Sequence, residues 1–95
     1  MYAKQEKLFL LFLVQAVSNQ VKLLLKHLTS SQYKALQEVA VNLLRTGLQL
    51  SDEQLKPLRR HKQFYRQLAQ GKKPRLLQKP LLLLLQAAQP TIEKL

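Results

Sequence analysis

The chain has 95 residues, a length that fits one small domain with a limited core. Sixteen Lys and Arg against five Asp and Glu give a formal net charge of +11, which attracts polyanions such as nucleic acids and anionic lipid surfaces. A hydrophobic fraction of 46% argues against intrinsic disorder, and the lack of cysteine excludes disulfides, thiol nucleophiles and cysteine-based metal sites.

The first predicted element is a long amphipathic helix from about residue 3 to residue 28. Apolar residues recur every three or four positions between Leu10 and Leu28, which is the spacing of a helical stripe. The first half, at positions 8–14, is apolar on nearly every side, and a solvated surface helix does not tolerate that pattern. We therefore expect the rest of the domain, another subunit or lipid to cover it.

The same apolar stretch follows Lys4 and Lys7, as the core of a signal peptide would. Polar residues from Gln15 onward follow at once and no small-residue cleavage site is evident, so secretion is not expected. A soluble intracellular, nuclear or virion-associated location is favoured. No stretch reaches the roughly 20 apolar residues that span a bilayer as a helix, and the protein is predicted to be soluble or peripheral.

Two capping boxes predict the starts of the next two helices. Thr29 with Gln32 starts a helix near Ser30, and Ser51 with Gln54 repeats the device. Gly47 is the expected stop between the two helices. The inner face of the earlier helix is predicted to consist of Tyr33, Leu36, Val39, Ala40 and Leu43.

The third helix is expected to run from about residue 51 to Gly71, with a kink or a restart at Pro57. A linker around Pro74 follows, and residues 75–79 form a short piece that could be helical. Pro80 suits the first turn of a last helix, at about 81–89, which Pro90 is expected to end.

The predicted fold class is therefore all-α, a small helical domain of three main helices plus a short C-terminal helix. The whole chain, 1–95, is predicted to form one domain. Residues 1–50 supply its helical core and assembly part, 51–79 its basic helix and linker, and 80–95 a leucine-rich tail.

The third helix and its linker carry many cations, and no acid lies among them. Projection at 100° per residue places an apolar arc opposite a basic stripe. The arc consists of Leu58, His61, Phe64, Tyr65 and Leu68. The candidate phosphate-binding residues are Lys56, Arg59, Arg60, Lys62, Arg66, Lys72, Lys73, Arg75 and Lys79.

A charged helix face is usually no more than a solvated face, but such a face normally carries both signs, and no acid lies between Lys56 and Lys79. We therefore predict contact with nucleic acid, DNA in particular, through its phosphates and independently of base sequence. Base stacking is not expected, because Phe64 and Tyr65 fall on the apolar arc.

No catalytic or metal-binding constellation is evident. His27 and His61 have neither cysteine nor a carboxylate pair nearby, and the five acids are scattered along the chain. The serines suit helix caps or the surface. The sequence predicts a non-enzymatic protein without a metal or cofactor.

Five consecutive leucines, at 81–85, surround a helix completely and cannot all face one small core. With the apolar front of the first helix they predict contact with a second copy, another protein or an anionic membrane, an oligomer being favoured. The candidate assembly or membrane residues are Leu8, Phe9, Leu11, Phe12, Leu13, Leu81, Leu82, Leu84 and Leu85.

About half of the chain resembles small basic proteins encoded by virus-like polinton and adintovirus elements in animal genomes. The matching segments are "EVAVNLLRTG", "LSDEQLKPLRRHKQFYRQLAQGKKPRLLQK" and "PLLLLLQ". Those proteins are similar to adenovirus core and internal capsid proteins. The resemblance implies packing of viral DNA inside a particle, or disruption of a membrane on entry.

The predicted function is that of a non-enzymatic, sequence-independent nucleic-acid-binding structural protein, of the kind that packages DNA in a viral core. One alternative is a helical adaptor or capsid-associated module whose basic face only keeps it in solution. A further alternative is a peripheral, membrane-active amphipathic protein.

Overall fold

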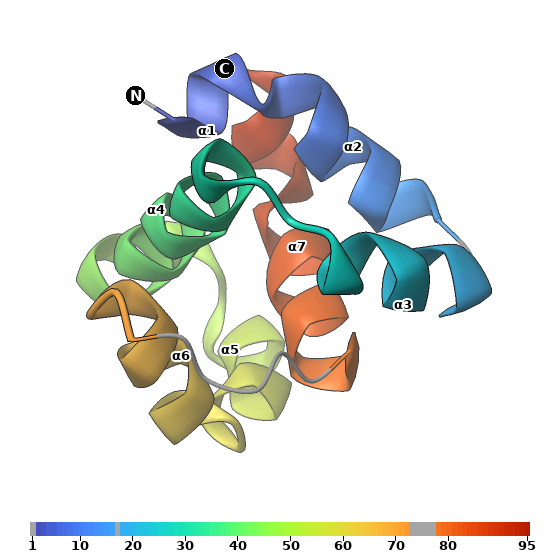
Figure 1. Cartoon of the computed structure of the whole chain (residues 1–95). Coiled ribbons are helices and arrows are strands. Elements are labelled where there is room, and N and C mark those ends of the chain that lie inside the picture. The colour runs from blue at the N-terminus through green and yellow to red at the C-terminus, as the bar shows by residue number, and fades with distance from the viewer. Residues whose placement is uncertain (1, 17, 73–77) are drawn as a thin grey trace.

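The computed structural model of the protein describes residues 2–16, 18–72 and 78–95 (Figure 1). Every regular element in these ranges is helical, which confirms the predicted all-α class. In chain order the elements are α1 (Tyr2–Gln5), α2 (Lys7–Gln15), α3 (Ser18–Lys26), α4 (Ser30–Thr46), the 3-10 turn η1 (Gly47–Gln49), α5 (Asp52–Arg59), α6 (Lys62–Ala69) and α7 (Gln78–Glu93).

Helix α7 runs through the middle of the molecule, where α2, α4 and α5 all pack against it (Figure 1). The residues on its inner face are each at most 1% exposed. They are Leu81, Leu84, Leu85, Ala88 and Ile92. The leucine-rich segment is thus the central element of the core, whereas a short C-terminal tail was predicted. Side chains of α2, α4 and α5 cover this segment. Its composition alone does not show whether it lies in the core or at an interface with another chain.

Pro80 lies in the first turn of α7, as predicted, but the prediction that Pro90 ends the helix is wrong. A proline inside a helix costs about 3 kcal/mol, because it removes one backbone hydrogen bond and crowds the preceding turn. Ile92, only 1% exposed, packs into the core one turn from the C-terminus. Its burial contributes roughly 1.5–3 kcal/mol, which offsets between half and all of that cost.

The predicted N-terminal helix is divided into three. The backbone kinks at Glu6 and becomes extended at Ala16, where ψ is 148°. A straight helix from residue 3 to residue 28 would be about 39 Å long. The longest dimension of the molecule is 33 Å, so a straight helix would leave one end unsupported. The break at Ala16 lets α2 bury Leu10 and Leu13 while α3 turns back and buries Val21 (Figure 1).

Both capping boxes are confirmed. The Thr29 hydroxyl accepts a hydrogen bond from the backbone N–H of Gln32 at 3.1 Å, and the Gln32 side chain accepts one from the Thr29 N–H at 3.0 Å. Ser51 and Gln54 form the same reciprocal pair. Gly47 ends α4 in the left-handed conformation, with φ of 64°. These local signals fix the bounds of α4 and the start of α5.

The predicted third helix is divided into α5 and α6. The restart expected at Pro57 occurs about one turn later, around Arg60 and His61. Pro57 weakens the hydrogen bonding of α5 but stays inside it. The change of direction allows α5 to pack against α7 while α6 packs against α4.

Tyr65 joins α6 to the start of α7. Its buried hydroxyl donates a hydrogen bond to the carbonyl oxygen of Pro80 at 2.7 Å, and burial raises its pKa to about 12 from the ordinary 10.0. The folded state therefore favours the neutral phenol. The resulting stability is complete below pH 10 and is lost as the pH rises from 10 to about 12.

We expect the thermal midpoint to fall over that alkaline range, and Tyr65→Phe to reduce the fall. Burial also raises the pKa of Tyr33, so part of the dependence should remain in the variant. At neutral pH, Tyr65→Phe should cost about 1 kcal/mol through the lost hydrogen bond. Thermal unfolding followed by circular dichroism across the pH range measures both effects. An equally steep fall in the variant would contradict the assignment to Tyr65.

Candidate nucleic-acid interface

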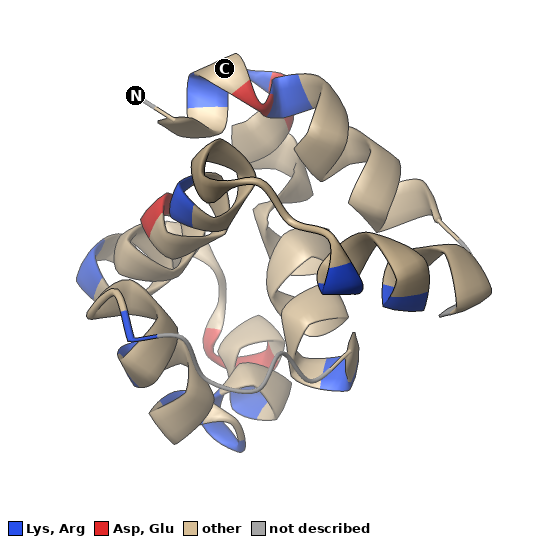
Figure 2. Cartoon of the chain, in the orientation of Figure 1, with Lys and Arg blue, Asp and Glu red and all other residues tan. Residues whose placement is uncertain are grey.

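The predicted phosphate-binding residues lie mainly on α5, α6 and the first turn of α7, which gather at the lower end of the molecule (Figure 2). The exposed members of the set are Lys56, Arg59, Arg60, Lys62, Arg66, Lys72 and Lys79. Lys73 and Arg75 lie outside the described residues. The seven exposed cations are called the basic surface below.

The opposite side of α6 fixes the orientation of this surface. Phe64, Tyr65 and Leu68 are at most 9% exposed and pack in the core, whereas Lys62 and Arg66, four positions apart on the helix, are exposed. The predicted division between apolar arc and basic stripe is confirmed for α6. Because both aromatic rings are buried, neither of them is available to stack on a base.

The helix break changes the geometry of the stripe, since Arg59 belongs to α5 and Lys62 to α6. The two side chains nevertheless line the same surface groove. The part of the basic surface between Lys56 and Arg66 therefore extends over two helices and the turn between them. A surface of this kind can follow a phosphate backbone through several separate contacts.

The sequence between Lys56 and Lys79 contains no acid, but in the structure an acid from outside this stretch lies beside the basic surface. Asp52 and Glu53 begin α5, where their charge suits the positive end of the helix dipole. The Asp52 carboxylate lies 3.7 Å from a guanidinium nitrogen of Arg59, with the two side chains 95% and 64% exposed. Water screens such an exposed pair strongly, so Arg59 can exchange this partner for a phosphate at small cost.

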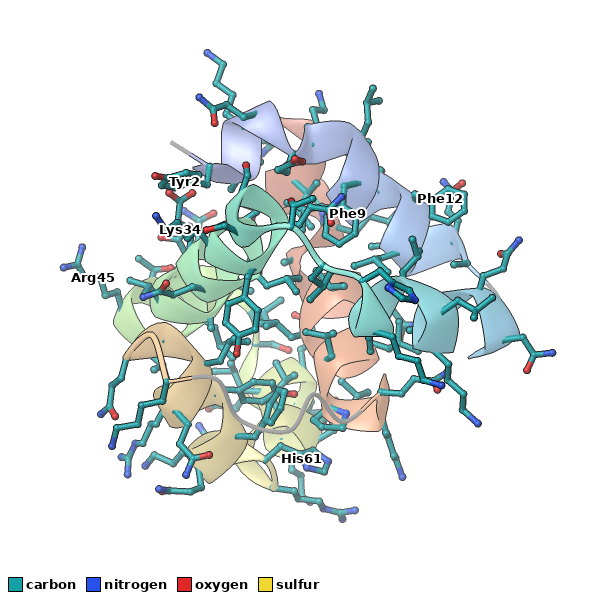
Figure 3. The ribbon with its side chains drawn as sticks, viewed as in Figure 1. Tyr2, Phe9, Phe12, Lys34, Arg45 and His61 are labelled. Carbon is teal, nitrogen blue, oxygen red and sulfur yellow. The ribbon has the colours of Figure 1, made fainter. Side chains whose placement is uncertain are left out.

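The predicted assembly or membrane residues fall into three classes. Leu13, Leu81, Leu84 and Leu85 are fully buried within the chain, and Phe9, Leu11 and Leu82 are half-buried. Leu8 and Phe12 are 83% and 51% exposed. Figure 3 shows Phe12 projecting away from the body of the molecule on α2. Of the predicted set, Leu8 and Phe12 thus present most of their surface to a possible second chain or lipid.

Two shallow grooves were not predicted. One, of about 410 Å³, lies along α7 and is lined by Lys79, Leu82 and Leu83 among others. The second, of about 330 Å³, separates the end of α4 from α5 and α6. Sequence periodicity could not reveal the second groove, because it depends on how far apart the packing sets these helices.

His27 is exposed and His61 is half-buried beside the Tyr65 ring, the two ring centroids being 6.5 Å apart. Over the described residues, no group of three or more His, Cys, Asp and Glu is placed to hold a metal ion. In the same part of the chain, none of the helices has both the length and the apolar character needed to cross a membrane.

No protein-family model matches this chain, and searches of curated proteins and of solved structures found no match either. The resemblance to proteins of polinton and adintovirus elements therefore stays a prediction from residue spacing.

Proposed function

We propose that the protein is a non-enzymatic, sequence-independent nucleic-acid-binding protein that contacts phosphates through the basic surface. The observation that carries the proposal is the exposure of the seven cations of the basic surface. Arg59 also has a carboxylate nearby, that of Asp52 at 3.7 Å, and this pair is exposed to water. Contacts to phosphate position a protein on nucleic acid but carry no sequence information. A structural role, such as packing DNA in a particle, is the finer proposal and rests on the resemblance alone.

Titration with duplex DNA at several salt concentrations tests the proposal. If about five phosphates are neutralised, counterion release should weaken binding about 500-fold between about 50 and 200 mM salt. Two duplexes of unrelated sequence should bind within about threefold of each other. Absence of binding at low salt, or affinity that does not change with salt, would exclude the proposal. A solubilising role for the basic surface would then be the better interpretation.

A further inference from the structure

The groove between α4 and the α5–α6 pair combines an apolar lining with cations. Leu43 and Leu44 line it from α4, Leu55 and Leu58 from α5, and Tyr65 from α6. Leu44 is 43% exposed and Leu55 is half-buried, so apolar surface in this groove remains in contact with water. Covering that surface would contribute free energy to the binding of an apolar side chain.

A strained turn follows α4 beside the groove, and its first residue, Gly47, belongs to the groove lining. Gly47, Leu48 and Gln49 all have positive φ, of 64°, 53° and 58°. Only glycine adopts this conformation readily, and each of the other two costs about 1–2 kcal/mol. The turn is held by the Thr46 hydroxyl, which accepts a hydrogen bond from the Leu48 N–H at 3.1 Å. Strain of this kind persists where the surrounding structure fixes it, and functional sites are common among such places.

Charge gives the groove a chemical preference. Arg59 and Lys62 line it together, and no carboxylate is among the described residues of its lining. The nearest acid to Arg59 is its exposed partner Asp52 at 3.7 Å. An occupant with apolar groups flanked by carboxylates would therefore satisfy both the apolar lining and the two cations.

We propose that this groove docks an acidic amphipathic helix of a partner protein. Apolar side chains spaced as i and i+4 would enter beside Leu44 and Leu55, with carboxylates next to Arg59 and Lys62. The groove is shallow, and its volume lies at the low end of the roughly 300–1,000 Å³ range of small-molecule sites, which enclose most of their ligand. A helix supported along one face suits an open groove better.

This inference goes beyond the proposed function and does not depend on it. The acidic helix and a phosphate backbone would nevertheless compete, because both use Arg59 and Lys62. A partner bound in the groove would then lower the affinity for nucleic acid, which is a route to release of a packed nucleic acid.

The probe is a fluorescent synthetic helix of about twelve residues, with leucines at i and i+4 and flanking glutamates, titrated by anisotropy. Leu44→Gln removes apolar lining without changing charge and should weaken binding at least about tenfold. The matched control is Leu23→Gln, which alters a 62% exposed leucine of α3 and should have no effect. Asp52→Asn should tighten binding about threefold by releasing Arg59.

Equal affinity of wild type and Leu44→Gln would overturn the proposal, as would equal binding of a peptide with glutamine at every glutamate. Binding of myristate that is sensitive to Leu44→Gln, with none of the acidic peptide, would assign the groove to a fatty acid and overturn it too. Duplex affinity of Leu44→Gln should equal that of the wild type. That control separates failure of the groove from failure of the proposed nucleic-acid function.

Discussion

Reversing three cations of the basic surface, with Arg59→Glu, Lys62→Glu and Arg66→Glu together, should weaken duplex binding at least about 100-fold at low salt. Each reversal removes one phosphate contact and adds a repulsive charge, and the slope of log affinity against log salt should fall by about three. All three side chains are exposed, so helicity and unfolding midpoint should change little. Anisotropy titrations at several salt concentrations measure affinity and slope together.

The matched control reverses Lys4, Lys22 and Lys26, exposed cations of α1 and α3, and so changes the net charge by the same amount. Lys34 is unsuitable, because its ammonium lies 4.9 Å from the centroid of the Tyr2 ring (Figure 3). The control should lose no more than about fivefold, through the long-range field of the whole protein. Equal losses in both triple variants would show that net charge, and not the basic surface, determines binding.

Local features of the fold could be predicted from the sequence because each depends on a few neighbouring residues. The hydrogen bonds of Thr29 with Gln32 and of Ser51 with Gln54 form within one helical turn, and Gly47 adopts its left-handed conformation for its own steric reasons. The inward orientation of Phe64 and Tyr65 likewise follows from helical periodicity.

Features that depend on tertiary packing were not predicted. The break at Ala16 has no proline or glycine to announce it, and it follows from fitting two apolar segments onto one small core. The central position of α7 likewise follows from packing several apolar segments around one small core. Three of its five consecutive leucines, Leu81, Leu84 and Leu85, are fully buried because helices approach from several directions.

The candidate interface also has some features that could be predicted from the sequence and others that depend on tertiary packing. The exposure of its cations was predictable, since charged side chains are rarely buried without partners. The Asp52–Arg59 ion pair was not predicted, because Asp52 precedes the acid-free stretch between Lys56 and Lys79 and lies seven positions before Arg59 on α5. The groove beside Leu44 requires three elements at a fixed separation, and no pattern along the chain encodes that separation.

Whether the leucine run serves the core or an assembly surface can be decided by Leu84→Ala. Leu84 is fully buried on the central helix, so truncation should leave a cavity and cost about 3–4 kcal/mol. A chain of 95 residues has only about 5–14 kcal/mol of total stability, so the variant should approach the threshold of folding. The urea midpoint should fall sharply, with an unchanged slope m.

Leu83→Ala is the matched control, because it truncates the neighbouring, half-buried leucine and should cost only about 1 kcal/mol. A core within one chain also requires that the midpoint not change with protein concentration, since a midpoint set by self-association rises with concentration. If Leu83→Ala cost as much as Leu84→Ala and the midpoint rose with concentration, the leucine run would be an interface between chains. With the expected result, Leu8 and Phe12 on α2 become the apolar residues to test for assembly.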